Sequence, residues 1–209
     1  MGKAITPAKR GKPLQSSDTS RRILTQAMKI FLRKGYHGTS IDDITRAAKL
    51  TKGALYWHFK GKEDLLKKIV EEYETRFLDR MIQTVTEVKG GVFEKIEKYF
   101  RYNAEFAYDN PELCVSFDTL AAELIGAHHG IETEFRRIYG KYREFLSKLI
   151  AQGKKEKVLK KEMDEGLSAL VLIAFHGGIL LQWSMNKDQI DGKAYVNTFK
   201  KIMLHGLMA

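Results

Sequence analysis

The sequence predicts an all-α fold, in which a small N-terminal helical unit precedes a larger helical body, with about nine helices in total. The only prolines are Pro7, Pro13 and Pro111, so residues 14–110 and 112–209 are free of the residue that most strongly interrupts helices. Few segments alternate apolar and polar residues as half-buried strands do. Apolar residues make up 44% of the 209 residues, which is enough for a substantial core.

The N-terminal unit begins after a basic arm. Residues 1–17 contain basic residues and no acidic one, and we expect a flexible arm there. Ser17 or Asp18 can cap a first helix that runs to about Lys34. Gly35 follows directly and is placed to end this helix in the left-handed conformation, which glycine adopts without strain.

Two short helices and one long helix complete the first third of the chain. Ser40 can cap the second helix, because Asp43 lies three residues later as an Asp variant of the capping box. Thr51 can cap a third helix over 51–59, which is too short to be a core helix. A fourth helix is expected over about 62–88, where a pair of glycines follows.

Similar signals divide the body. Asn110 followed by Pro111 is a typical helix start, and Asp164 can cap a later helix. The sequence His128-His129-Gly130 interrupts the helix that begins at Pro111. We expect body helices over about 92–109, 111–127, 131–155, 164–186 and 192–207.

The helix over 164–186 is apolar on all sides. From residue 166 onward it lacks formal charge except on His176, and its length borders on that of a membrane span. Ser168, Gln182 and two adjacent glycines argue against a lipid environment. We therefore expect a helix buried between other helices and no membrane partner.

The positive charge of the chain is concentrated at one end. Residues 1–70 carry 16 Lys and Arg against 5 Asp and Glu, whereas residues 71–209 carry 20 against 21. A basic head on a neutral body indicates binding to a polyanion such as nucleic acid. The alternative is a solvated basic face without a partner.

Several function classes find no support in the sequence. The single cysteine, Cys114, excludes an internal disulfide framework and a cysteine-based zinc site. The N-terminus has no apolar segment typical of a secretory signal, so we expect a cytoplasmic protein. No metalloprotease, phosphate-loop, nucleophile-elbow or dinucleotide motif occurs, so we expect no enzyme, no cofactor and no metal. His128 and His129, near Glu132 and Glu134, are interpreted as an exposed turn.

One segment carries a family resemblance. Residues 35–66 resemble the DNA-binding domain of the TetR family of bacterial transcriptional regulators. The matching elements are Gly35-Tyr36, Thr39-Ser40-Ile41, Asp43-Ile44, Ala47-Ala48, Lys52-Gly53, Leu55-Tyr56, His58-Phe59 and Lys62-Glu63. The resemblance implies a helix-turn-helix domain over 18–64 and a ligand-binding and dimerisation domain over 65–209. Lys49 departs from the family pattern where glycine is common, and Gly61 departs where serine is common.

The third helix is the expected recognition helix. Leu50, Leu55 and Phe59 are expected to face the first two helices, which leaves another set of side chains facing outward. Residues expected at base edges are Lys52, Gly53, Ala54 and Trp57.

Other residues are expected to contact the DNA backbone and to fix the register of the protein. Those expected at phosphates are Ser40, Arg46, Thr51, Tyr56, His58 and Lys62. Lys62 stands at a helix N-terminus and is interpreted as a phosphate clamp. The alternatives are that Tyr56 and Trp57 are half-buried, that His58 is an ordinary surface histidine, and that Lys62 is a solvated helix end.

The body is expected to bind an effector and a second copy of the chain. The resemblance implies an effector cavity, for which the aromatic-rich middle helices suit a lipophilic molecule. Candidate cavity residues are Phe100, Asn103, Phe106, Phe117, Tyr139, Phe175 and His176. An internal hydrogen bond is the alternative for the amide and the imidazole.

The last two helices are expected to form a four-helix bundle with the same helices of a second chain. Residues 178–183 resemble the dimer-forming helix of the family. Candidate interface residues are Leu170, Ile173, Leu180, Trp183, Tyr195, Phe199, Ile202 and Met203. The alternative is that they form the core of a single chain.

The resemblance thus implies a homodimeric repressor that a small lipophilic effector releases from a palindromic DNA operator. The alternatives are an activator of the same fold and a non-specific nucleic-acid-binding protein.

Overall fold

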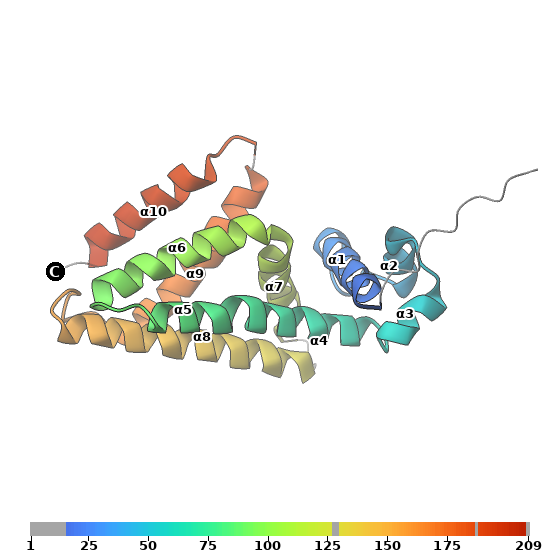
Figure 1. Cartoon of the computed structure of the whole chain (residues 1–209), viewed down its shortest axis with the longest axis horizontal. Helices are drawn as coiled ribbons and strands as arrows, with labels where there is room; N and C mark the ends of the chain where they lie inside the picture. Colours follow the sequence, from blue (N-terminus) through green and yellow to red (C-terminus); the bar gives the residue numbers. More distant parts are fainter. Residues whose placement is uncertain (1–15, 127–129, 187, 208–209) are drawn as a thin grey trace, which may run out of the picture.

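The computed structural model describes residues 16–126, 130–186 and 188–207, and in this part of the chain it is all-α, as predicted (Figure 1). The α-helices are α1 (Ser16–Lys34), α2 (Ile41–Ala48), α3 (Lys52–His58), α4 (Lys62–Tyr73), α5 (Arg80–Thr86), α6 (Val92–Asp109), α7 (Pro111–Leu124), α8 (Gly130–Lys155), α9 (Glu165–Met185) and α10 (Gly192–Leu207). A π-helical segment, η1 (Glu74–Asp79), joins α4 to α5 without a break, so the described residues form nine helical rods, the number expected.

The helix boundaries follow the predicted caps closely. Ser40 and Asp43 form the complete capping box of α2, and the Thr51 hydroxyl accepts a hydrogen bond of 3.1 Å from the Ala54 amide at the start of α3. Gly35 ends α1 with φ of +71°, as predicted. Lys49 adopts the left-handed conformation with φ of 51°, so a non-glycine residue makes this turn.

Two predicted boundaries need correction. The helix expected over 111–127 ends at Leu124, because Ile125 is extended and Gly126 turns the chain with φ of +84°. The first helix begins at Ser16, inside the segment assigned to the basic arm. The rest of that arm, residues 1–15, and the pair His128 and His129 lie outside the described residues.

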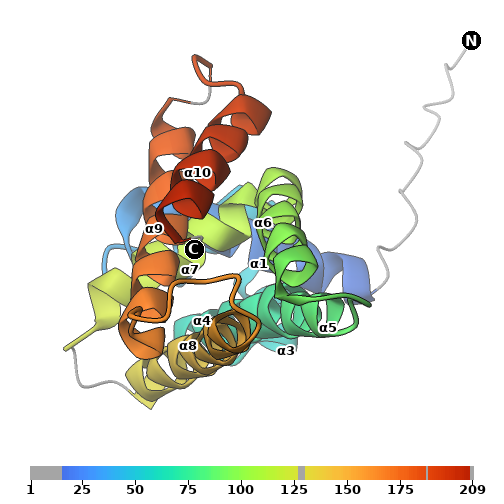
Figure 2. The same cartoon turned by 90° about the vertical axis from the view of Figure 1, so that its left-hand side faces the viewer.

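The helices form two groups that share one continuous core. Helices α1, α2 and α3 gather at one end of the molecule, and the rod α4–η1–α5 runs from α3 along the body beside α8 (Figure 1). Helix α7 packs against both α1 and α9, and it therefore lies between the two groups (Figure 1). Helix α10 packs on α6 (Figure 2).

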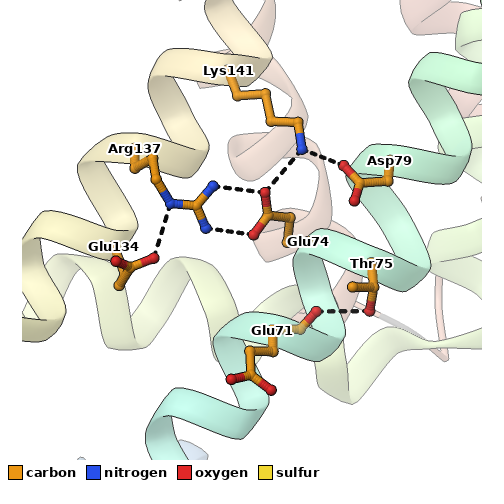
Figure 3. A network of polar contacts seen from close by, with 7 residues as sticks. All are labelled: Glu71, Glu74, Thr75, Asp79, Glu134, Arg137 and Lys141. Atoms are coloured by element: carbon orange, nitrogen blue, oxygen red, sulfur yellow. Dashed lines mark hydrogen bonds and ion pairs between the residues drawn. The ribbon is translucent and has the colours of Figure 1, made fainter.

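The π-helical segment η1 is fixed by charged residues of α8 (Figure 3). The Glu74 carboxylate accepts hydrogen bonds from the guanidinium of Arg137, one of them 2.7 Å long, and one of 2.9 Å from Lys141. Lys141 also binds Asp79, at the other end of the segment. These contacts, with Arg137 first among them, lower the pKa of Glu74 to about 2. The same turn directs Phe77 into the core, where it is fully buried.

Candidate nucleic-acid interface and effector cavity

Helix α3 is anchored by its apolar side and displays its other side. Leu55 is fully buried and Phe59 is 6% exposed, as expected, and Leu50 is half-buried against the same core. On the other side Trp57 is 74% exposed and Tyr56 is 53% exposed. Two large aromatic side chains in water are costly unless a partner covers them, so this face is suited to binding.

The remaining residues expected at base edges lie beside these rings. Lys52 and Gly53 are exposed, and Ala54 is half-buried. The Lys52 ammonium lies 2.8 Å from a carboxylate oxygen of Asp42 on α2, and this hydrogen bond raises the pKa of Lys52. Both side chains of this pair are more than half exposed, so the pair is weak and leaves the Lys52 ammonium accessible to another anion.

The residues expected at phosphates differ in their exposure. Ser40, Arg46 and Thr51 are exposed beside α3, although the two hydroxyls also serve as helix caps. His58 is half-buried and meets the Trp57 ring edge to face at 4.7 Å between centroids.

Lys62 points toward the protein instead of outward. Its ammonium donates hydrogen bonds to the Tyr36 carbonyl at 2.7 Å and to the Thr39 carbonyl at 3.0 Å. It also lies 4.4 Å from the centroid of the Tyr36 ring. The structure therefore differs from the expected phosphate clamp, because two backbone carbonyls of the turn between α1 and α2 already bind the Lys62 ammonium.

Sequence reasoning missed a carboxylate on the other side of this turn. Glu123 of α7 accepts hydrogen bonds from the backbone amide of Tyr36 at 2.7 Å and from that of His37 at 3.0 Å. The partners are 86 and 87 residues apart in the sequence, and no local pattern signals such a contact.

A cavity of about 250 Å³ lies between α6, α9 and α10. Three of the expected effector-site residues line it, namely Phe100, Asn103 and His176. Tyr99, Trp183 and Phe199 are also in its wall, which is mainly apolar. Such a space suits a small lipophilic molecule.

The other four expected cavity residues do not line this space. Phe117 is fully buried and stacks on Tyr73 at 3.6 Å between ring centroids. Phe106 packs against Phe77, and Phe175 is 47% exposed on α9. These positions reflect helix rotation, which an aromatic-rich composition does not specify.

The fourth of these residues, Tyr139, belongs to a separate polar pair. Its hydroxyl donates a hydrogen bond of 2.9 Å to the Asp118 carboxylate. Burial raises the pKa of Asp118 to about 6, although this hydrogen bond acts in the opposite direction.

The polar groups of the cavity wall differ in how well they are paired. The Asn103 amide donates to the Tyr99 carbonyl at 2.8 Å and accepts from the Tyr142 hydroxyl at 3.2 Å, so its internal partners satisfy it. His176 is half-buried as a residue, but its Nε2 atom is out of solvent and has no hydrogen-bond partner among the described residues. Burial lowers the pKa of His176 to about 4, so the imidazole is neutral at pH 7.

Helix α9 exposes an apolar stripe, in contrast to the expectation that it is buried. The stripe consists of Leu167, Leu170, Val171, Phe175, Leu181 and Met185, which are between 46% and 70% exposed. Among the described residues, α9 is the one helix long and apolar enough to cross a membrane, and only 17% of its apolar window is buried. At about 100° of rotation per residue, these six positions fall within an arc of about 140°, so the stripe lies on one face of the helix.

The expected dimer residues divide between this surface and the interior. Leu170 and Ile202 are exposed, whereas Leu180 and Met203 are buried within the chain and Ile173 is half-buried. The remaining three, Trp183, Tyr195 and Phe199, line the cavity. The exposed members of the expected set lie on both helices, Leu170 on α9 and Ile202 on α10.

Comparison with known proteins gives consistent matches. Residues 23–69 match the family described as bacterial regulatory proteins, tetR family. The chain is 30% identical over 134 residues to the transposon Tn10 TetC protein of Escherichia coli, which covers 64% of this chain and 66% of that protein. It is 24% identical over 173 residues to the HTH-type transcriptional repressor DhaR of Mycobacterium sp. (strain GP1), covering 82% of this chain and 86% of that protein.

Solved structures share the fold over nearly the whole chain. The MbdR regulator from Azoarcus sp. CIB superposes with a TM-score of 0.83 at 26% identity, covering 91% of this chain and 100% of that one. The regulator FadR from Bacillus subtilis, in complex with stearoyl-CoA, gives a TM-score of 0.71 at 22% identity, covering 89% and 98%.

Proposed function

Because the chain belongs to the TetR family of bacterial transcriptional regulators, we propose that it is a homodimeric repressor that a small lipophilic effector releases from a palindromic operator. The observation that carries the DNA-binding part is the joint display of Lys52, Tyr56 and Trp57 on the outer surface of α3. In this proposal residues 18–64 form the DNA-binding domain and residues 65–209 form the effector-binding and dimerisation domain of a cytoplasmic protein.

Helix α3 enters the major groove in this proposal. Lys52 exchanges Asp42 for guanine acceptors, and Trp57 covers apolar base edges beside Gly53 and Ala54. A second set of side chains contacts phosphates and fixes the register of the protein without reading the base sequence. These side chains are Ser40, Arg46, Thr51, Tyr56 and His58. Lys62 supports this surface from below through its bonds to the turn between α1 and α2.

A dimer follows from the exposed stripe of α9. One seven-residue helix reads too few base pairs for useful specificity, so a two-fold pair of α3 helices is needed. The outer face of α9 is large, apolar and uncharged, as a self-complementary two-fold interface requires. Two copies paired through this face have two-fold symmetry, which matches the symmetry of a palindromic operator.

The cavity supplies the effector site. Its apolar wall and the neutral imidazole of His176 favour an uncharged or largely apolar group in its interior. The complex of the related FadR fold with stearoyl-CoA supports a lipophilic class of ligand. An effector can release DNA only if it binds the non-DNA-binding conformation more tightly, so its affinity must fall when operator is present.

The test is selection of duplexes from a random DNA library by the purified protein, followed by binding measurements at several salt concentrations. The proposal expects an inverted repeat with specific binding at least about a thousandfold tighter than binding to random duplex. Lys52→Ala is expected to relax preference at one base position in each half-site. Equal affinity for selected and random duplexes would instead establish non-specific binding and reject a repressor.

A further inference from the structure

We propose that Glu123 is a positioning residue, through which α7 holds the DNA-binding helices in register and transmits occupancy of the cavity to them. This inference rests on the proposed function. It assigns a connection between the cavity and the DNA-binding end through α7. This connection is separate from the rod α4–η1–α5, whose Phe77 stacks on the cavity residue His176 at 5.5 Å between ring centroids. It also gives a role to a carboxylate that belongs to the body and lies at neither the DNA-binding surface nor the cavity.

The contact at the DNA-binding end is specific in its geometry. Each carboxylate oxygen of Glu123 accepts one backbone amide, Oε2 from Tyr36 at 2.7 Å and Oε1 from His37 at 3.0 Å. The left-handed Gly35 beside them leaves room for the carboxylate, since a Cβ there would lie 3.0 Å from both oxygens. Charged acceptors make the stronger class of hydrogen bond, and two from one side chain fix its orientation.

The same turn is held from the opposite side. The Tyr36 amide binds Glu123, and the Tyr36 carbonyl binds the Lys62 ammonium at the start of α4. The turn between α1 and α2 therefore lies between an anion from α7 and a cation from α4. When α7 or α4 moves, it either breaks its hydrogen bond to this turn or moves the turn with it. Helix α3 then moves as well, because α2 joins the turn to α3.

The other end of α7 reaches the cavity. Cys114, in the first turn of α7, is buried against Ala107 and Leu180. Both of these residues also line the cavity. Cys114 and Glu123 are nine residues apart on one helix, a distance of roughly 14 Å along its axis. Helix α7 thus has a cavity end and a DNA-binding end.

The contacts explain how a small displacement becomes a switch. An effector that presses on Ala107 or Leu180 displaces Cys114, and a helix transmits this displacement along its length. The two Glu123 hydrogen bonds tolerate little movement, because a lengthening of about 1 Å takes them beyond hydrogen-bonding distance. The turn between α1 and α2 is then released on one side.

Because Glu123 is charged, a positioning effect and a purely electrostatic effect of its removal change the affinity for DNA in opposite directions. DNA is a polyanion, so removal of any carboxylate near the binding end should strengthen binding to all duplexes. A positioning role predicts the opposite sign, and only for the operator. The matched control is Glu112, another carboxylate of α7 that faces α1 through a 4.0 Å contact with Lys29, with both side chains about half exposed.

The first experiment measures the affinity of Glu123→Ala, Glu123→Gln and Glu112→Ala for the selected operator and for random duplex. We expect Glu123→Ala to bind operator about tenfold or more weakly while its random-duplex affinity is unchanged or higher. Glu123→Gln retains one acceptor and is expected between Glu123→Ala and wild type. Glu112→Ala should bind operator at least as well as wild type. Operator affinity of Glu123→Ala equal to that of Glu112→Ala overturns the proposal.

The second experiment tests the cavity end without an effector. Ala107→Leu fills space beside Cys114 and is expected to weaken operator binding about tenfold in the wild-type background. In the Glu123→Ala background the same change should matter less than about twofold, because the connection is already broken. Ala151→Leu, at an exposed position of α8, controls for the added side chain. Additive effects of Ala107→Leu and Glu123→Ala reject transmission through α7.

Thermal unfolding of each variant establishes that the variant is folded, and hydrogen exchange reports directly on the turn. The amides of Tyr36 and His37 should exchange faster in Glu123→Ala.

A wild-type protein without sequence-specific binding would reject the proposed function itself. Specific wild-type binding with an unaffected Glu123→Ala would reject only the role of Glu123.

Discussion

Replacement of Lys62 by methionine distinguishes an inward structural cation from an outward phosphate clamp. Methionine keeps the length and the apolar part of the side chain but removes the ammonium that donates to the Tyr36 and Thr39 carbonyls at 2.7 and 3.0 Å. A hydrogen bond from a charged group contributes about 1.5–3 kcal/mol when it is well shielded. Lys62 is only half-buried, so screening reduces the two bonds together to about 2 kcal/mol.

The expected result is a clear loss of stability. For a chain of this length about 2 kcal/mol lowers the midpoint of thermal unfolding by roughly 4–8 °C. Calorimetry or circular dichroism measures this shift, and Lys67→Met is the control. Lys67 lies on the same helix but forms an exposed pair with Glu63, so its replacement should change the midpoint much less.

DNA binding provides the second measurement. A lysine that contacts one phosphate contributes about 0.9 to the slope of log affinity against log salt concentration. Lys62→Met should leave this slope within error of the wild-type value. A normal unfolding midpoint combined with a slope reduced by about 0.9 would refute the structural reasoning and restore the phosphate clamp.

Two further predictions concern the dimer surface and the buried titratable groups. Leu181→Glu places a charge on the exposed stripe of α9 and should convert the proposed dimer to a folded monomer, as measured by sedimentation. A variant that stays dimeric would place the interface elsewhere. The folded-state pKa of about 4 for His176 lies below its unfolded value, so its contribution to stability is present above about pH 6.5 and is lost as the pH falls toward 4. The raised pKa of Asp118, about 6, has the opposite sign, because its contribution is present at low pH and is lost as the pH rises through 6. Urea unfolding of His176→Phe and Asp118→Asn against wild type over pH 4–7 isolates the two effects, and parallel pH profiles would contradict both.

Local signals in the sequence were sufficient to predict the helices and the exposure of one face of α3. Ser40, Thr51 and Gly35 mark helix ends through interactions with residues a few positions away, so a reader of the sequence can place them. The exposure of Tyr56 and Trp57 followed from the shortness of α3 and the need to bury Leu55.

Contacts between distant residues could not be predicted in this way. The partner carbonyls of Lys62 are 23 and 26 residues away, and Glu123 lies still further from the turn it binds. The rotation of each body helix is also decided by packing. Phe117 and Phe175 are both aromatic and both fit a cavity by composition, yet one is in the core and the other faces solvent.

The π-helical segment η1 has a consequence for the geometry of the whole rod. A π-turn accommodates one more residue than an α-turn, and each residue of an α-helix adds about 100° of rotation and 1.5 Å of length. If Glu74–Asp79 rewound as regular α-helix, Lys62 and the helices attached to it would turn by about 100° relative to α5. Arg137 and Lys141 hold the extra residue in place by binding Glu74 and Asp79 from α8. These four charges therefore set the rotational phase at which one half of the protein faces the other.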